Sequence, residues 1–279
     1  MAGERPVTRR LLLTAGGLTL LAGCSTTPPS RGGHTKTLTK SPVAAREPEA
    51  TGEFAGDREP ATAHPALTPP PGTTGAPDPR LAARSDQPMF YIDDGPRAIA
   101  LTIDDGPNPI YTPQILALLA RHNVTASFSM IGISVQQYPA IARDVAAAGH
   151  VITNHTWQHL YLPALPAAAA CFQMDRATEA IQRATGQIPA FFRAPYGSWS
   201  ATVLERCAQT GMTPVDWSVD PRDWAQPGVP SIVENILRNT RTGSIILEHD
   251  GGGNRAQTVA ALRIVIPRLL DAGYQFYPL

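Results

Sequence analysis

Residues 98–107 read AIALTIDDGP, a largely apolar run that ends in two aspartates, a glycine and a proline. A short apolar run bounded by turn residues is typical of a buried β-strand. Similar runs follow at residues 126–131, 150–153, 190–193, 213–219, 244–248 and 274–277. Helical patterns separate them, near residues 111–122, 135–148, 168–185, 200–210, 229–241 and 256–272. Regular alternation of strands and helices predicts parallel strands covered by helices.

About seven strand–helix units in one stretch of chain favour an α/β fold with a closed or nearly closed barrel over a doubly wound sheet. Glycines stand where four of the helices should end, at Gly149, Gly186, Gly211 and Gly273. Pro267 interrupts the last helical pattern and predicts a kink or a restart of that helix.

In such barrels the functional site forms at the C-terminal ends of the strands. Ionisable residues follow five of the seven expected strands: Asp104 and Asp105, His155, Arg193, Asp220 and Asp223, and His249. A near-copy of the first turn, residues 93–96 (DDGP), precedes the first strand. It is therefore expected to be a turn at the opposite end of the barrel.

His155 and His159 are four residues apart, which places both imidazoles on one face of a helical turn, within reach of one metal ion. A catalytic metal site needs three protein ligands, and one carboxylate of Asp104 and Asp105 could be the third. The other carboxylate could then serve as a base, since adjacent aspartates are costly without partners. The alternative is that residues 104–107 form only a turn.

Five short motifs resemble those of the polysaccharide deacetylase family and occur in the family's order. They are Thr102-Ile103-Asp104-Asp105-Gly106, His155-Thr156-Trp157-Gln158-His159, Arg193-Ala194-Pro195-Tyr196, Asp220-Pro221-Arg222-Asp223-Trp224 and Leu247-Glu248-His249. The resemblance covers roughly residues 97–278 and departs from the family at Ile103, where phenylalanine is usual.

The resemblance implies a distorted (β/α)7-type barrel that removes N- or O-acetyl groups from sugars. It implies that Asp105, His155 and His159 hold one divalent metal ion. Zinc is the usual ion, with Co²⁺, Ni²⁺ and Mn²⁺ as alternatives.

The same resemblance implies roles in acid–base catalysis. Asp104 becomes the general base that Arg193 orients, and His249 becomes the general acid that Asp223 holds. The backbone N–H of Tyr196 would stabilise the oxyanion. Residues expected to contact the substrate are Tyr196, Trp199, Trp224 and Leu247, with sugar stacking expected for the two tryptophans.

Residues 1–23 are expected to be an export signal. Arginines precede the apolar residues 11–21, a stretch too short to span a bilayer. The sequence Leu21-Ala22-Gly23-Cys24 resembles a bacterial lipobox, in which Cys24 carries the lipid, and residues 8–12 (TRRLL) resemble a twin-arginine signal. An ordinary cleaved signal with an incidental cysteine is the alternative.

Residues 24–86 hold 11 of the 28 prolines and one aromatic residue, Phe54, and are expected to form a disordered linker. The chain is thus expected to be exported and anchored to the outer face of the cell membrane, with a monomeric catalytic domain at residues 87–279. In that domain, Cys171 and Cys207 could form a disulfide or remain two buried thiols. The net charge of zero argues against a nucleic-acid partner.

The expected activity is metal-dependent removal of N-acetyl groups from a GlcNAc-containing polysaccharide, such as peptidoglycan or chitin-like oligomers. An acetyl-xylan esterase of the same fold is one alternative. A catalytically silent carbohydrate-binding barrel is another, but it predicts loss of Asp104 or His249, and both are present. A glycosidase using Asp104 with Asp220 or Asp223 would leave the histidine pair unexplained.

Overall fold

The computed structural model describes residues 87–279. The expected signal at residues 1–23, the lipidation site Cys24 and the expected linker at residues 24–86 lie outside the described residues and stay predictions. Within residues 87–279, no helix is long and apolar enough to cross a membrane.

The strands form one parallel sheet in the order β5-β4-β3-β2-β1-β6, with β7 paired to the start of β1. They are β1 (Ala98–Asp104), β2 (Ser127–Met130), β3 (Val151–Asn154), β4 (Phe191–Phe192), β5 (Thr213–Pro214), β6 (Ile245–His249) and β7 (Gln275–Phe276). All seven residues of β1 are buried, as expected of a strand covered on both faces.

The strand expected at residues 213–219 is shorter than predicted, because β5 ends at Pro214, where its partner strand β4 also ends, at Phe192. Beyond it, isolated bridges join Val215 to Met89 and Val219 to Ile246 of β6. The second bridge brings the chain after β5 back to the far edge of the sheet. The expected fold, a distorted (β/α)7-type barrel, is confirmed.

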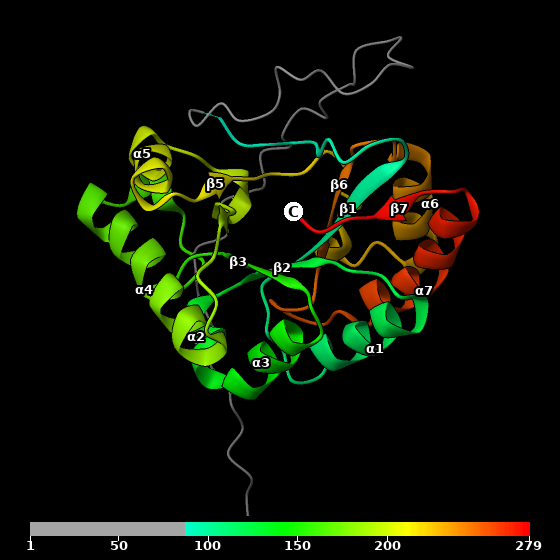
Figure 1. Cartoon of the computed structure of the whole chain (residues 1–279), viewed down its shortest axis with the longest axis horizontal. Helices are drawn as coiled ribbons and strands as arrows, with labels where there is room; N and C mark the ends of the chain where they lie inside the picture. The colour runs from blue at the N-terminus through cyan, green and yellow to red at the C-terminus, as the bar shows by residue number, and fades with distance from the viewer. Residues whose placement is uncertain (1–86) are drawn as a thin grey trace, which may run out of the picture. The chain divides into compact units, whose positions relative to one another are not determined.

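Helices surround the strands in the order α5, α4, α2 and α3, α1, α7, α6 (Figure 1). Their bounds are α1 (Thr112–His122), α2 (Gly132–Gln137), α3 (Pro139–Ala147), α4 (Ala167–Thr185), α5 (Ala201–Thr210), α6 (Val229–Asn239) and α7 (Ala256–Asp271). Short 3-10 turns η2 (Leu162–Ala164), η3 (Pro195–Gly197) and η4 (Asp223–Ala225) lie in the loops. The four expected capping glycines all have positive φ, at or just after a helix end.

Two helix predictions need correction. The single helix expected at residues 135–148 is two helices, because Tyr138 precedes a proline and leaves the helical region, with φ −126° and ψ 57°. Of the kink or restart expected at Pro267, the restart is wrong, since α7 continues through that residue. The buried apolar face of α7, which includes Leu262 and Ile266, packs into the main core and holds the helix together.

The two cysteines of the domain are free, so the disulfide alternative is wrong. Cys207 is buried in α5, and burial raises the pKa of its thiol to about 12. Cys171 is only partly buried, so the prediction of two buried thiols holds for one of them. The tetrapeptide at residues 93–96 is a turn that precedes β1, as expected, with both aspartates exposed.

Candidate active site

The carboxyl ends of four strands bring most of the predicted residues together. Asp104 ends β1 and His249 ends β6, and the two lie side by side in the parallel register. His155 follows β3, and Arg193 follows β4. The site therefore forms where the parallel topology predicts it.

Asp105, His155 and His159 form a cluster whose ligand atoms all lie within 4.8 Å of one another. Asp105 Oδ1 is 3.5 Å from His155 Nε2 and 3.4 Å from His159 Nε2. This oxygen is buried and accepts no hydrogen bond. A buried carboxylate oxygen between two imidazole nitrogens fits a divalent cation of the zinc type.

The orientation of His155 also suits a metal ligand. Its Nδ1 lies 2.8 Å from the carbonyl oxygen of Arg193. A carbonyl only accepts hydrogen bonds, so Nδ1 carries the proton and donates it. In the neutral imidazole, Nε2 therefore keeps its lone pair toward the cluster.

The loop that carries the two histidines is not helical, contrary to the predicted helical turn. Thr156 and His159 both have positive φ, at 67° and 59°. The Asn154 side chain accepts from the N–H of Thr156 at 2.8 Å, and the Thr156 hydroxyl accepts from the N–H of His159 at 2.9 Å. These side-chain bonds fold the loop so that the two rings meet, with centroids 4.8 Å apart.

Burial and mutual charge shift the pKa of all three residues of the cluster. Burial alone would raise the pKa of Asp105, but the neighbouring imidazoles, His159 first among them, hold it well below the usual range. Burial lowers the pKa of His159 to about 4, although Asp105 opposes this shift. The pKa of His155 is raised, because Asp104 and Asp105 outweigh its burial. An ionised carboxylate and a neutral His159 are the protonation states that bind a metal.

Asp104 lies between this cluster and a buried arginine. Arg193 is fully buried, and its Nη1 donates to Asp104 Oδ1 at 2.7 Å. The same guanidinium donates to the Thr102 hydroxyl at 2.8 Å and to the carbonyl of Asp216 at 2.9 Å. The other oxygen of Asp104 is 3.8 Å from His155 Nε2. One oxygen is thus fixed by Arg193 while the other faces the cluster.

His249 forms a tight pair with Asp223. His249 Nδ1 is 2.7 Å from Asp223 Oδ1, and the second carboxylate oxygen accepts from the His249 N–H at 2.9 Å and from the Thr258 hydroxyl at 2.7 Å. Burial opposes a charged imidazole, but Asp223, with smaller contributions from Asp105 and Asp104, raises the pKa of His249 to about 9. His249 is therefore a cation at neutral pH.

The predicted substrate residues differ in exposure. Tyr196 is 55% exposed in η3, with its ring edge-on to His159 at 4.7 Å, and Trp224 is 40% exposed in η4. Trp199 is partly buried, with its indole N–H on Asp216 Oδ2 at 3.0 Å, and Leu247 is buried within β6. Contact of all four with substrate stays a prediction.

Four buried charged or acidic residues near the site were not predicted: Asp216, Glu248, Asp250 and Arg255. Glu248 is fully buried beside Asp223, and its burial and that negative charge raise its pKa well above the usual range. Burial and the charge of Asp105 raise the pKa of Asp250 to about 7. Asp250 and Glu248 flank His249 in the chain, so the sequence could have placed both near the site. No nearby motif places Arg255 there.

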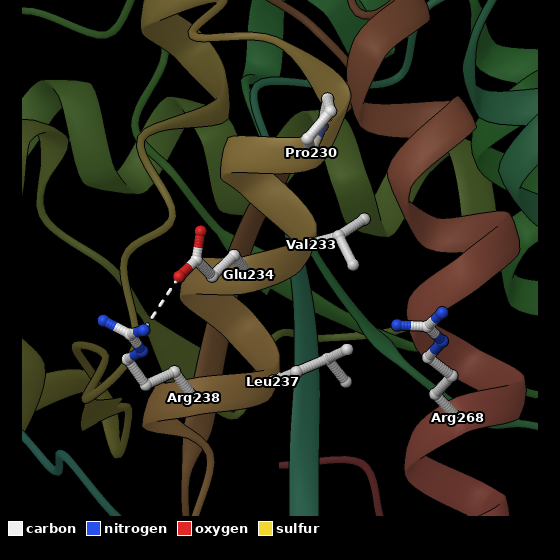
Figure 2. Close-up of a pocket in the computed structure, with 6 residues that line it drawn as sticks. All are labelled: Pro230, Val233, Glu234, Leu237, Arg238 and Arg268. Atoms are coloured by element: carbon white, nitrogen blue, oxygen red, sulfur yellow. Dashed lines mark ion pairs between the residues drawn. The ribbon is translucent and has the colours of Figure 1, made fainter.

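A separate hollow lies between α6 and α7, on the outer helices (Figure 2). It is lined by Pro230, Val233, Glu234, Leu237, Arg238 and Arg268. An exposed ion pair, Glu234 with Arg238 at 2.9 Å, lies along α6 on the side away from α7 (Figure 2). None of the predicted site residues lines this hollow, so it is not part of the candidate active site.

Comparison with known proteins identifies the family. A model described as polysaccharide deacetylase matches residues 92–215. A chitooligosaccharide deacetylase of Rhizobium leguminosarum bv. trifolii is 42% identical over 206 residues, which cover 70% of this chain and 96% of the relative. The chain belongs to the polysaccharide deacetylase family. The expected class of enzyme, a deacetylase and hence a hydrolase, is confirmed.

Two further members of the family show how far the similarity extends. A peptidoglycan-N-acetylglucosamine deacetylase of Bacillus cereus is 40% identical over 189 residues, covering 67% of this chain and 88% of the relative. The solved structure of a peptidoglycan N-acetylglucosamine deacetylase superposes with a TM-score of 0.66 at 36% identity. That match covers 68% of this chain and 89% of the other. The family fold is thus shared over nearly the whole described domain.

Proposed function

We propose that this polysaccharide deacetylase removes N-acetyl groups from a GlcNAc-containing glycan, peptidoglycan or chitin-like oligomers, with one divalent metal ion. The observation that carries the proposal is the convergence of Asp105, His155 and His159 beside Asp104. The His249–Asp223 pair ends the neighbouring strand. These are the groups that amide hydrolysis needs: a cation, a base and an acid.

Zn²⁺ is the proposed ion, because one carboxylate and two imidazoles are a ligand set that zinc prefers at catalytic sites. Co²⁺, Ni²⁺ and Mn²⁺ are alternatives that accept similar ligands. When bound, a divalent cation lowers the pKa of water from 15.7 to roughly 7 and polarises the carbonyl.

Asp104 is the proposed general base, which takes a proton from the attacking water as the new C–O bond forms. Its free oxygen faces the cluster, and the Arg193 bond holds the carboxylate in that direction. Because Arg193 is fully buried, its charge acts on Asp104 with little screening. Arg193 is therefore proposed to orient Asp104.

His249 is the proposed general acid, which gives its proton to the leaving nitrogen as the C–N bond breaks. An amine leaves poorly without a proton, and His249 is protonated at neutral pH because Asp223 raises its pKa. The products are acetate and a free amino sugar. The backbone N–H of Tyr196 is proposed to stabilise the oxyanion, a contribution of about 3 kcal/mol for one well-placed donor.

The named activities of the relatives support both chitooligosaccharides and peptidoglycan as substrate classes. Tyr196, Trp199, Trp224 and Leu247 are proposed to contact the sugar. The glycosidase alternative fits less well, because it gives His155 and His159 no role. Of its two candidate partners for Asp104, Asp220 and Asp223, the second already accepts bonds from His249 and Thr258.

The decisive test is mass spectrometry of acetate loss from GlcNAc oligomers, peptidoglycan fragments and acetylated xylan, with metal-reconstituted protein. We expect loss of acetyl groups from one or both GlcNAc substrates, and loss of at least about 100-fold in the rate for Asp104→Asn. The control is Asp93→Asn, in the similar turn before β1. Full activity in Asp104→Asn would contradict the assigned base. Acetyl loss from xylan alone would favour the esterase, and no acetyl loss would favour a silent barrel.

The protein is also proposed to be an exported lipoprotein, with Cys24 as the lipidated residue and residues 24–86 as the linker to the domain. The supporting observations are the charged and apolar pattern of residues 1–23 and the lipobox-like sequence before Cys24. We expect full-length protein in the membrane fraction and Cys24→Ala released from it. Equal membrane association of Cys24→Ala would contradict the anchor.

A further inference from the structure

Arg255 is a buried cation directly before α7, and its side chain points back toward the site. The residue is 4% exposed, and among residues 87–279 no carboxylate forms an ion pair with it. Instead, its Nε donates to the carbonyl of Gly251 at 2.6 Å, its Nη2 to that of Gly252 at 3.0 Å and its Nη1 to that of Trp224 at 3.3 Å. A buried guanidinium whose hydrogen bonds all go to backbone carbonyl oxygens fixes the conformation of that backbone.

The two glycines that Arg255 holds pack directly on the metal ligand Asp105. A Cβ at Gly251 would lie 2.1 Å from the backbone oxygen of Asp105, and one at Gly252 would lie 2.6 Å from its Oδ2. The same loop is bonded to the preceding residue, since the N–H of Asp250 donates to the carbonyl of Asp104 at 3.0 Å. Residues 250–252 therefore form a wall behind Asp104 and Asp105.

The third bond of Arg255 reaches the other half of the site. Trp224 follows Asp223 in η4, the turn that carries the partner of His249. One planar guanidinium thus joins the wall behind Asp105 to the turn that holds His249. Its rigid fork can donate in several directions at once, which a lysine ammonium on its flexible stem cannot reproduce.

We propose that Arg255 is a positioning residue that holds the loop of residues 250–252 against Asp105 and ties this loop to the turn of Asp223. The proposal rests on the metal-dependent function proposed above. It assigns Arg255 no contact with substrate or ion. Its effect is to keep the Asp105 carboxylate directed at the two histidines. It also fixes the position of the loop of residues 250–252 relative to the turn that carries Asp223.

The test is the zinc affinity of the full chain, measured by competition with a chromophoric chelator, alongside kcat and KM. Partners that orient metal ligands typically affect affinity by 10- to 100-fold, so Arg255→Met is expected to weaken zinc binding by about tenfold or more. We expect kcat to fall while KM changes little, with Arg255→Lys restoring only part of both losses. The matched control is Arg206→Met, since Arg206 also donates three bonds, two to Asp175 at 2.9 and 2.8 Å and one to Gln209 at 3.2 Å. It should lower stability without changing zinc affinity.

A second pair of variants tests the wall without removing a buried charge. Gly252 and Gly253 both have positive φ, at 68° and 139°, so a Cβ strains the backbone at either position. Only the Cβ at Gly252 would press on the Asp105 carboxylate. At Gly253 the nearest atom is Arg255 Nη2, 3.9 Å away. Gly252→Ala is expected to weaken zinc binding at least about tenfold more than Gly253→Ala.

The outcomes separate the two proposals. Wild-type protein that binds no divalent ion would contradict the proposed function. Wild-type zinc binding with unchanged affinity in Arg255→Met, or equal effects of the two glycine variants, would overturn the positioning role alone. If Arg255→Met does not fold, the zinc affinities of Arg255→Lys, Gly252→Ala and Gly253→Ala are compared with that of the wild type. Unchanged affinity in Arg255→Lys together with equal affinities of the two glycine variants would then overturn the positioning role.

Discussion

At the scale of single residues, two ionisable groups of the site are each held by a buried neighbour from another element. Arg193, after β4, bonds Asp104 of β1, and Asp223, in η4, bonds His249 of β6. Such pairs act strongly because burial removes the screening by water. Removing Arg193 should therefore change the direction of Asp104, and removing the Asp223 carboxylate should lower the pKa of His249.

This coupling predicts a shift in the pH profile of Asp223→Asn. His249 acts as an acid only when protonated, so kcat/KM of the wild type should stay level through neutral pH and fall as pH rises through about 9. Without the Asp223 carboxylate, burial pulls the pKa of His249 downward, and the alkaline limb should move toward lower pH. The shift of the alkaline limb would be measured from rates of acetate release at roughly pH 6 to 10.

The matched control for that profile is Asp175→Asn, which removes a carboxylate paired with Arg206 outside the site. Its alkaline limb should coincide with that of the wild type. An alkaline limb that stays in place in Asp223→Asn would show that His249 is not the acid, or that Asp223 does not set its pKa.

The sequence was enough to predict which ionisable residues meet at the strand ends. It did not predict the loop of residues 250–252 that packs behind them. Asp104, Asp105 and His249 were found because they follow strand ends, and their neighbours confirm that they converge. Arg255 and the packing of Gly251 on Asp105 left no local signal, since they depend on how two loops meet. A charged residue before a helix is usually solvated, and only its 4% exposure shows otherwise.

At the scale of elements, the fold depends on close packing between helices that the hydrophobic pattern does not specify. Gly132 begins α2 where this helix meets α4. A Cβ there would lie 2.9 Å from the Cα of Ala177 and 2.6 Å from the Trp157 ring. Because one of these atoms is backbone, the contact cannot be relieved by a rotamer change alone. The glycine allows the two helices to approach.

Gly132→Ala is therefore expected to destabilise the domain by about 1–3 kcal/mol through overpacking. The measurement is the midpoint of urea unfolding, with the slope checked for two-state behaviour. Gln136→Ala, at an exposed position of the same helix, is the control and should change stability by less than about 0.5 kcal/mol. Equal stability of Gly132→Ala and wild type would mean that α2 can move away from α4 at little cost.

The ends of helices and strands also depend partly on local sequence and partly on tertiary contacts. Patterns of apolar residues predicted every strand and most helices, but a proline changed one boundary, separating α2 from α3 at Pro139, and a short partner strand ended β5 early. At Pro267 the opposite held, because the packed face of α7 outweighed the lost hydrogen bond. A proline interrupts an element only where tertiary contacts do not compensate.

At the scale of the whole molecule, a metal ion would join loops from separate strands and so stabilise the folded state. The proposed ligands come from the turn after β1 and the loop after β3. An ion that binds only the folded chain adds about 2.7 kcal/mol at a free concentration of 100 times its Kd. Zinc should therefore raise the melting temperature by several degrees, and chelation should abolish both the shift and the activity.

Two histidine variants test this zinc stabilisation, one at a proposed ligand and one as a control. His159→Ala should lose most of the zinc-dependent rise in melting temperature, whereas His122→Ala, at the end of α1 and outside the cluster, should keep it. Calorimetric scans with zinc and with chelator would provide the comparison. A full zinc shift in His159→Ala would exclude this histidine as a ligand.

The sequence by itself determined the parallel barrel, the order of its strands along the chain and the residues at the strand ends, because these follow from local apolar runs and the motifs after them. Only the tertiary structure decided that the histidine loop is held by Asn154 and Thr156 rather than by a helix. It also decided that the cysteines stay apart and that a buried Arg255 lies behind Asp105. The physical reason is that these features depend on contacts between segments far apart in the chain, where burial and close approach set the energies.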